Sequence, residues 1–141
     1  MTFTRLFNGG AAHLELIDGD DPLNAGLEIF AQPAGKKLTS LALMSGGEQS
    51  MTATALIFAL LQTNPAPICV LDEVDAALDN VNVDKVASYI QKQSSDCQMI
   101  VISLKDEFYK RAHSLIGVYK DKASQSSGTL TLPLEQYESA A

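Results

Sequence analysis

The sequence predicts a single α/β domain over residues 1–141, and two patterns in it support that class. Segments with the period of a strand alternate along the chain with segments of helical period. Residues 68–71, Ile-Cys-Val-Leu, form a continuous apolar run that ends in two acids, which predicts a strand of a parallel sheet that is buried on both faces. Residues 82–93 predict an amphipathic helix whose inner face carries Val83, Val86, Ala87 and Ile90.

The remaining elements follow from the same periodicities. Residues 13–17 and 27–31 alternate as half-buried strands do, and the turn cluster at 18–22 separates them, so residues 1–40 predict antiparallel strands and turns. Residues 48–63 lack Gly and Pro and are apolar on nearly every face, which predicts a buried helix. A second apolar strand, a short helix and two closing strands are expected at residues 99–102, 106–113, 115–119 and 129–132.

Composition argues against several classes of function. The net charge is −7, which disfavours nucleic-acid binding through this segment alone, and we interpret Lys36 and Lys37 as solvated surface. Cys69 and Cys97 have neither metal-ligand spacing nor a disulfide framework, which fits a reducing compartment. No signal peptide is found, and no apolar stretch approaches the roughly 20 residues that span a bilayer, so no membrane partner is expected.

The first motif is Ser45-Gly46-Gly47-Glu48, directly before the predicted buried helix. Ser45 and Glu48 have the spacing of a capping box, which satisfies amides at the start of a helix. A second interpretation is anion binding, because a helix start offers free N–H groups and Gly46 and Gly47 let a phosphate approach the backbone. Spacing alone leaves both interpretations open.

The second motif is Asp72-Glu73, at the end of the apolar strand. In open α/β sheets, ligands bind beyond the carboxyl ends of strands. One carboxylate there can hold Mg²⁺ and the other can orient or deprotonate a water, although two solvated acids at a strand end are the plainer interpretation. The third motif, residues 74–79, could be a simple loop in which Asp79 or Asn80 caps the next helix.

Taken in this order, the three motifs resemble the ABC-type ATPase family. Residues 45–48 match its signature motif, residues 71–73 the end of its Walker B strand, and residues 76–79 its D-loop. The version Asp-Glu-Val-Asp-Ala-Ala-Leu-Asp is that of SMC (structural maintenance of chromosomes) proteins, since transporter ATPases usually carry Pro where this chain has Val74.

The resemblance covers nearly all of the chain and divides between two kinds of SMC protein. Residues 6–75 resemble bacterial condensin-type heads, and residues 75–119 resemble the first SMC subunit of cohesin. Many ABC ATPases carry a switch histidine where this chain has Leu104, as cohesin-type heads do. His13 and His113 lie elsewhere, and we interpret both as surface or structural residues.

The resemblance implies the C-terminal lobe of an ABC-type P-loop NTPase head, with a mixed, largely parallel sheet, flanking helices and an N-terminal antiparallel part. No Gly-x-x-x-x-Gly-Lys-Ser/Thr occurs, so Walker A is expected on an N-terminal half of the head, separated from this half by a coiled coil. ATP hydrolysis is expected only when the two halves combine.

The resemblance also implies roles for individual residues. Asp72 is expected to hold Mg²⁺ and Glu73 to act as the catalytic base. The signature residues Ser45, Gly46, Gly47 and Glu48 are expected to bind, in trans, the ATP of a second head, and the D-loop residue Asp79 to lie across that joint.

Expected partners are the N-terminal half of the head, a second SMC head joined through ATP, and a kleisin subunit; DNA is expected only through the full complex. The implied process is chromosome condensation and segregation, in the cytoplasm or nucleoid of a bacterium or on nuclear chromosomes. Two alternatives are an isolated or engineered lobe that acts as a non-catalytic interaction module, and the head half of a DNA-repair relative.

Overall fold

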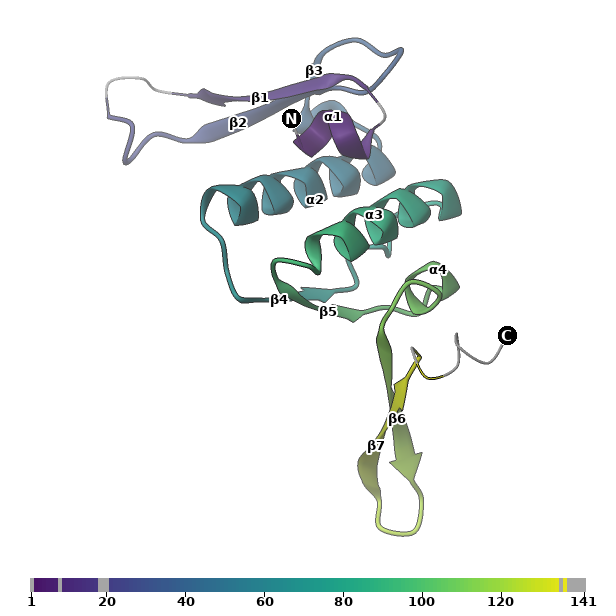
Figure 1. Cartoon of the computed structure of the whole chain (residues 1–141). Helices are drawn as coiled ribbons and strands as arrows, with labels where there is room; N and C mark the ends of the chain where they lie inside the picture. The colour runs from purple at the N-terminus through teal and green to yellow at the C-terminus, as the bar shows by residue number, and fades with distance from the viewer. Residues whose placement is uncertain (1, 8, 18–20, 135, 137–141) are drawn as a thin grey trace.

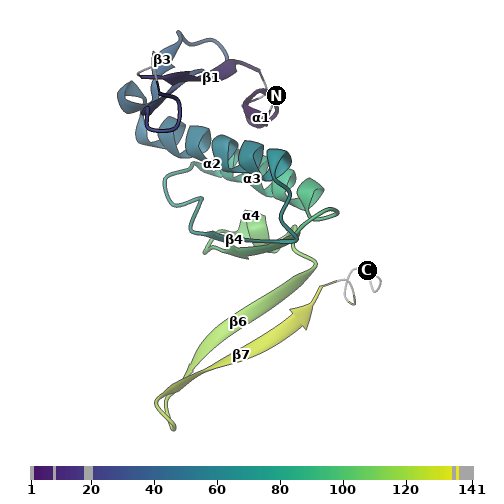
Figure 2. The same ribbon diagram turned by 90° about the vertical axis from the view of Figure 1, so that its left-hand side faces the viewer.

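The computed structural model describes residues 2–7, 9–17, 21–134 and 136, and it confirms the mixed α/β class. Figures 1 and 2 show an antiparallel sheet, a layer of two helices and a pair of parallel strands stacked in that order, with a hairpin extending away. The elements are α1 (Thr2–Leu6), β1 (Ala11–Leu16), β2 (Leu27–Gln32), β3 (Thr39–Ser40), η1 (Leu41–Leu43), α2 (Gly46–Thr63), β4 (Ile68–Asp72), α3 (Asn80–Gln93), β5 (Gln98–Ile102), α4 (Asp106–Tyr109), β6 (Ser114–Asp121) and β7 (Ser126–Pro133).

The antiparallel sheet has the order β1-β2-β3, which confirms the two strands expected in this part of the chain. Most of the turn cluster between them lies outside the described residues. The expected half-burial of the first strand is wrong, because every residue of β1 is exposed. Residues 1–40 are also not only strands and turns: α1 is a short helix in which Phe3 stacks on Phe7, with ring centroids 4.1 Å apart.

The helices α2 and α3 form the middle layer and supply most of the core. The predicted inner face of α3 is confirmed, since all four of its apolar residues are buried. Phe58 of α2 is fully buried and meets Tyr89 of α3, with ring centroids 4.8 Å apart. The helix α2 is not covered all round, however, because Ile57 and Leu60 remain exposed.

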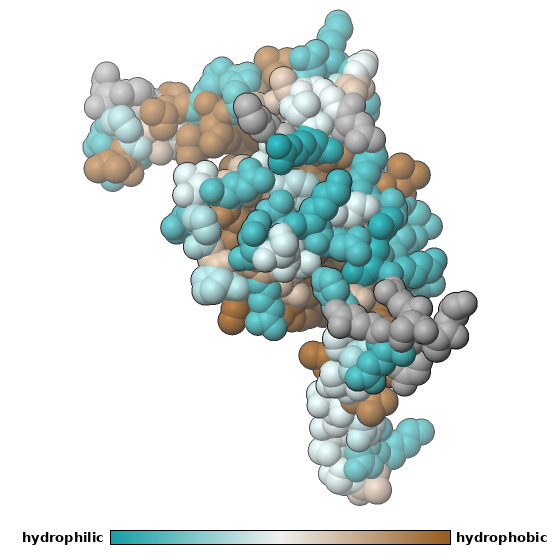
Figure 3. Space-filling view, in the orientation of Figure 1, coloured by the Kyte–Doolittle hydropathy of each residue, from teal (hydrophilic) through white to brown (hydrophobic). Residues whose placement is uncertain are grey.

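The strands β4 and β5 pair in parallel, as the apolar runs predict, with Val70 opposite Ile100. Leu71 faces the helices and is buried, whereas Ile68, Val70, Ile100 and Ile102 are exposed. The expected burial of this strand on both faces is therefore wrong for the chain as it stands. Figure 3 shows hydrophobic atoms along the lower edge of the body, at the level of these strands.

The closing strands β6 and β7 form an antiparallel hairpin whose ladder runs from Ser114–Pro133 to Asp121–Ser126. Figures 1 and 2 show it projecting away from the helices, and most of its residues are exposed. The helix before it is shorter than expected, ending at Tyr109. Among the described residues, parallel pairing is confined to β4 and β5.

The longest helix is not a membrane span: within the described part of the chain, no helix is both long and apolar enough to cross a bilayer.

Candidate functional site

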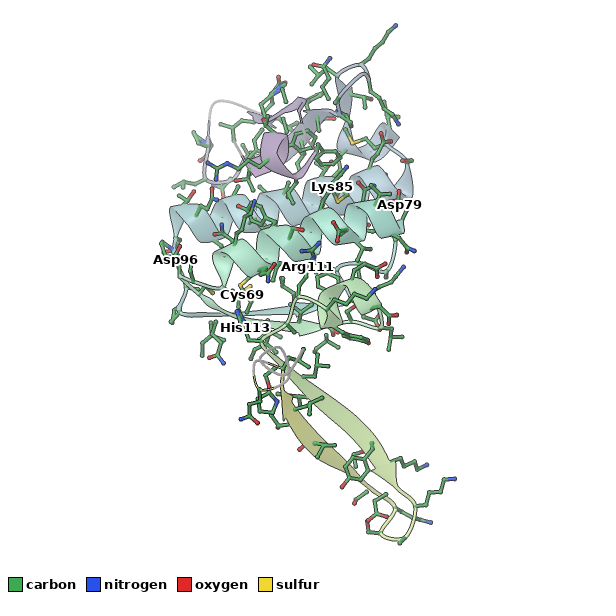
Figure 4. All side chains as sticks on the ribbon, turned by 45° about the vertical axis from the view of Figure 1, so that its right-hand side comes forward. Cys69, Asp79, Lys85, Asp96, Arg111 and His113 are labelled. Carbon is green, nitrogen blue, oxygen red and sulfur yellow. The ribbon has the colours of Figure 1, made fainter. Side chains whose placement is uncertain are left out.

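The candidate site residues gather at one end of the helical layer. The strand β4 ends there in Asp72, and the helices α2 and α3 both begin there. Figure 4 labels Asp79 at the start of α3 and Asp96 at the opposite end of the layer. Because free N–H groups at helix starts and carboxylates at the end of a parallel strand face the same region, this end can hold an anion together with a cation.

The signature turn, residues 45–48, begins α2 with the predicted capping box. Ser45 takes the extended conformation of an N-cap residue. The Glu48 carboxylate accepts the Ser45 backbone N–H at 3.2 Å and the Ser45 hydroxyl at 2.6 Å. The Ser45 hydroxyl is therefore directed to Glu48.

Lys36 lies on the surface, as predicted, and also pairs with the signature turn, which the sequence did not predict. Its ammonium group lies 2.7 Å from Glu48 Oε1, although the lysine side chain is itself 62% exposed. The Lys36 contact and the Ser45 hydroxyl lower the pKa of Glu48 to about 2. Glu48 therefore stays ionised through the physiological pH range, and its negative charge is offset by a lysine from the loop before β3.

Gly47 brings the signature turn against the loop of residues 73–79, called the acidic loop below. A Cβ built on Gly47 would lie 3.3 Å from the Ala77 carbonyl oxygen, a tighter approach than most side chains make. The same addition at Gly46 meets nothing within 4 Å. A side chain at position 47 would therefore press on the backbone of the acidic loop, whereas position 46 faces open space.

Asp72 and Glu73 occupy the end of β4 and are both exposed. Asp72 is the last residue of the strand, and the Glu73 backbone N–H donates to the Ile102 carbonyl at 3.0 Å. Glu73 has φ +47°, in the left-handed region that residues with a Cβ rarely adopt. Strain of this kind collects at functional sites and costs about 1 kcal/mol or more, so its presence here supports a functional role for Glu73.

The acidic loop is a pair of tight turns that ends in a helix cap. The Ala76 N–H donates to the Glu73 carbonyl at 3.1 Å, and the Leu78 N–H donates to the Asp75 carbonyl at 3.0 Å. Asp79 then caps α3, its carboxylate accepting the Asn82 backbone N–H at 2.9 Å. Of the two predicted caps, Asp79 is the one used.

Sequence reasoning missed two contacts that hold the acidic loop. The Ser103 hydroxyl donates to the buried Asp75 carboxylate at 2.7 Å, across 28 residues of chain. Lys105 reaches the Leu78 carbonyl at 3.5 Å. The available signal was that Asp75 lies inside the third motif and that Ser103 ends an apolar strand, but no periodicity links the two.

Both histidines are surface residues, as the sequence predicts. Leu104, at the switch-histidine position, is 88% exposed. His113 is exposed, and His13 lies on the antiparallel sheet, stacked on Phe30. Cys69 is a half-buried free thiol whose pKa is raised, chiefly by burial and also by Cys97.

The donor set fits magnesium held together with a phosphate rather than a protein-only metal cage. No group of three or more His, Cys, Asp or Glu side chains in the described part of the chain could hold a metal ion. Mg²⁺ is usually bound by one or two carboxylates with waters and substrate phosphates. The exposed carboxylate of Asp72 at the end of β4 is compatible with that kind of site.

The sequence is similar to SMC proteins from bacteria and yeast. It is 48% identical over 134 residues to the chromosome partition protein Smc of Bacillus subtilis, covering 95% of this chain and 11% of that protein. It is 45% identical over 130 residues to structural maintenance of chromosomes protein 1 of Schizosaccharomyces pombe, again 11% of its length. A protein of Rhodospirillum rubrum, described only by its place beside ATPase CF(0) subunits, is 51% identical over 89% of this chain and 73% of its own length.

Solved SMC heads share the fold. A Smc head of Pyrococcus furiosus, with an extended coiled coil and bound to the C-terminal domain of ScpA, matches 99% of this chain and 34% of its own, with TM-score 0.86 and 41% identity. A structure from work on ATP-driven dimerization and DNA-stimulated activation of SMC ATPases matches 99% of this chain and 83% of its own, with TM-score 0.84 and 40% identity.

The family model supports the same assignment from a third direction. The model described as the RecF/RecN/SMC N terminal domain matches residues 16–127, which include the signature turn, the acidic loop and β5. The chain spans about a tenth of the length of the bacterial and yeast SMC proteins that it matches. By family model, sequence and fold together, the chain belongs to the SMC proteins of the RecF/RecN/SMC family.

Proposed function

We propose that this chain is the C-terminal half of an SMC ATPase head, and that it supplies half of an ATP-hydrolysing site. The observation that carries the proposal is the packing of Gly47 against Ala77 at the end of β4. It joins a phosphate-binding helix start, an acidic pair and a helix cap into one surface. A simple helix cap or two solvated acids would not require these motifs to meet.

Asp72 and Glu73 divide the chemistry between them. Asp72, at the end of the strand, is the ligand for Mg²⁺, which when bound offsets charge on the phosphates of ATP. A carboxylate oxygen of Glu73 accepts a proton from the attacking water. The left-handed backbone of Glu73 supports this role. It turns the chain sharply directly after β4, and strained residues of this kind collect at functional sites.

The signature turn serves a different nucleotide, the one held by a second head. The free N–H groups of α2 and the open backbone at Gly46 would meet its phosphates, with Ser45 turning its hydroxyl from Glu48 to the phosphate. Glu48 keeps the turn in shape, and Asp79 lies beside it at the start of α3. ATP then joins two heads, and hydrolysis releases them.

The N-terminal half of the head, which carries Walker A, docks on the bare face of β4 and β5. Four branched aliphatic side chains are exposed on that face, Ile68, Val70, Ile100 and Ile102, with the polar side chains of Gln98 and Asp72 at its ends. An apolar face of this kind, beside the acidic pair, is the surface that a second half of the sheet would cover. Without that half, strong ATP binding and hydrolysis are not expected.

The remaining partners follow from the relatives. The solved head from Pyrococcus furiosus is bound to the C-terminal domain of ScpA, and we extend a kleisin-type partner to this chain. The projecting hairpin β6–β7, with Ile116, Val118 and Leu130 exposed, is the surface available for it. DNA is contacted through the complete complex, on chromosomes.

A second function is a non-catalytic interaction module. The absence of a Gly-x-x-x-x-Gly-Lys-Ser/Thr sequence favours it for the chain by itself, and the bare strand face would be its docking surface. The name of the family model also covers the relatives RecF and RecN, but the similar proteins described above are SMC proteins.

The deciding experiment measures ATP hydrolysis by this chain alone and mixed with an N-terminal SMC head half that carries Walker A. We expect hydrolysis only in the mixture, and we expect Glu73→Gln to lower kcat at least a hundredfold while ATP-driven pairing persists. Glu28→Gln, on the antiparallel sheet, is the matched control and should have no effect. A stable complex without hydrolysis would favour the interaction module, and full activity in Glu73→Gln would remove Glu73 from the role of base.

A further inference from the structure

Asp75 is a buried carboxyl side chain within the acidic loop. It is 3% exposed, and none of the ion pairs formed by described residues involves it. Its described side-chain partner is the hydroxyl of Ser103, which donates at 2.7 Å. A buried carboxyl group is costly unless it is hydrogen-bonded, so the position of Asp75 depends on Ser103.

Ser103 is itself held in place by its neighbours. Its hydroxyl oxygen accepts the Lys105 backbone N–H at 2.9 Å, which orients the O–H toward Asp75. Its carbonyl accepts the Tyr109 hydroxyl at 2.6 Å. These two hydrogen bonds hold the turn between β5 and α4, from which Ser103 donates to Asp75. The Lys105 side chain makes a second link by donating to the Leu78 carbonyl.

The acidic loop needs such an anchor because Glu73 is strained. A residue held at φ +47° persists only where the surrounding structure fixes it. Glu73 is fixed at its own backbone by Ile102 and Ala76. Asp75, two residues further on, is where a side chain ties the acidic loop to the neighbouring strand.

We propose that Ser103 and Asp75 form a positioning pair, which holds the acidic loop against the end of β5 and so sets the orientation of Glu73 and Asp79 for hydrolysis. The proposal rests on the ATPase function proposed above. In this proposal neither Ser103 nor Asp75 contacts the nucleotide, and both act through Glu73 and Asp79. It also gives a polar link between β5 and the acidic loop in a chain whose switch-histidine position holds an exposed leucine.

The test uses the head reconstituted from this chain and an N-terminal half carrying Walker A. Ser103→Ala should lower kcat about tenfold, as loss of a hydrogen bond to a charged group does, with KM for ATP within twofold of wild type. Ser103→Thr keeps the hydroxyl and should restore kcat. Asp75→Asn combined with Ser103→Ala should be no slower than the slower single variant, because both break the same contact.

A second readout does not depend on ATP. Hydrogen exchange at the Ala76 and Leu78 amides, which donate within the acidic loop, should be about tenfold faster in Ser103→Ala. Ser114→Ala is the matched control, since it removes a hydroxyl that donates to the Leu132 carbonyl on the hairpin. It should change neither kcat nor exchange in the acidic loop.

The possible outcomes distinguish the positioning pair from the proposed ATPase function. An active wild-type head whose Ser103→Ala variant keeps its kcat overturns the positioning pair alone, as does an equal loss in Ser114→Ala. A wild-type mixture that forms a complex and hydrolyses no ATP overturns the proposed function. In that case, unchanged amide exchange in Ser103→Ala would also overturn the hold on the acidic loop.

Discussion

The two faces of the β4–β5 pair are built from the same kind of residue and have opposite surroundings. Leu71 points to the helices and is 4% exposed, whereas its neighbour Val70 points away and is 59% exposed. Most side chains that point to either face of β4 and β5 are apolar, a pattern typical of strands that are buried on both faces. The chain covers one face with its helices, and the other is the face on which we propose that the N-terminal half of the head docks.

The largest expected effect is on stability, from a substitution on the face of β4 that the helices cover. Leu71→Ala should lower the free energy of unfolding by about 2–5 kcal/mol, because it opens a cavity beneath α2 and α3. Val70→Ala, one residue away, should lower it by less than about 1 kcal/mol, since much of that side chain stays hydrated. Urea denaturation of the two variants measures both values, and equal losses would mean that the two faces are packed alike.

An intermediate effect is expected on the exposed face of β4 and β5, and it is measured as a change in affinity for the N-terminal half of the head. Val70→Lys places a charge where the N-terminal half is proposed to dock, and it should weaken that association at least tenfold because a buried, unpaired charge is costly. Unfolding of the chain alone should change by less than about 1 kcal/mol, as for other exposed sites. Val118→Lys, on the hairpin, is the control in sedimentation experiments; equal binding by all three proteins would contradict docking on this face.

The smallest effect is at the signature turn, where the contact is partly exposed. The folded-state pKa of Glu48 is about 2, below its ordinary value of 4.5, so its contribution is present above pH 4.5 and is lost as the pH falls toward 2. Lys36→Ala should remove about 0.5–1 kcal/mol of that contribution at pH 7, within the range of exposed pairs. Unfolding measured at pH 7 and pH 3 should show a smaller difference in Lys36→Ala than in wild type or Lys37→Ala. The same difference in all three would remove Lys36 from the pair.

Local patterns predicted the parts of the fold that depend on near neighbours. The inner face of α3, the capping box at Ser45 and the cap at Asp79 each depend on residues a turn or less apart, and all three are confirmed. The acidic pair was predicted at the end of a strand, and it lies there. The motifs therefore predicted the local backbone structure around the candidate site, while the roles of its residues stay predictions.

The features that the sequence did not predict are contacts between distant segments, a very short helix and the exposure of one strand face. The Ser103–Asp75 and Lys36–Glu48 contacts join separate segments, and periodicity carries no information on such pairs. The helix α1 is five residues long, too short to show a helical period. The exposure of β4 on one face was missed because an apolar run predicts the surroundings of a strand in the assembled protein, whichever chain provides them.

The left-handed backbone at Glu73 sets stability against activity at one position. Glycine adopts that conformation without strain, so Glu73→Gly should make the lobe more stable while it removes the carboxylate. A lobe used only for docking would have every physical reason to carry Gly or Asn there. A glutamate at this position therefore fits the catalytic role that we propose for it, at the cost of a strained turn.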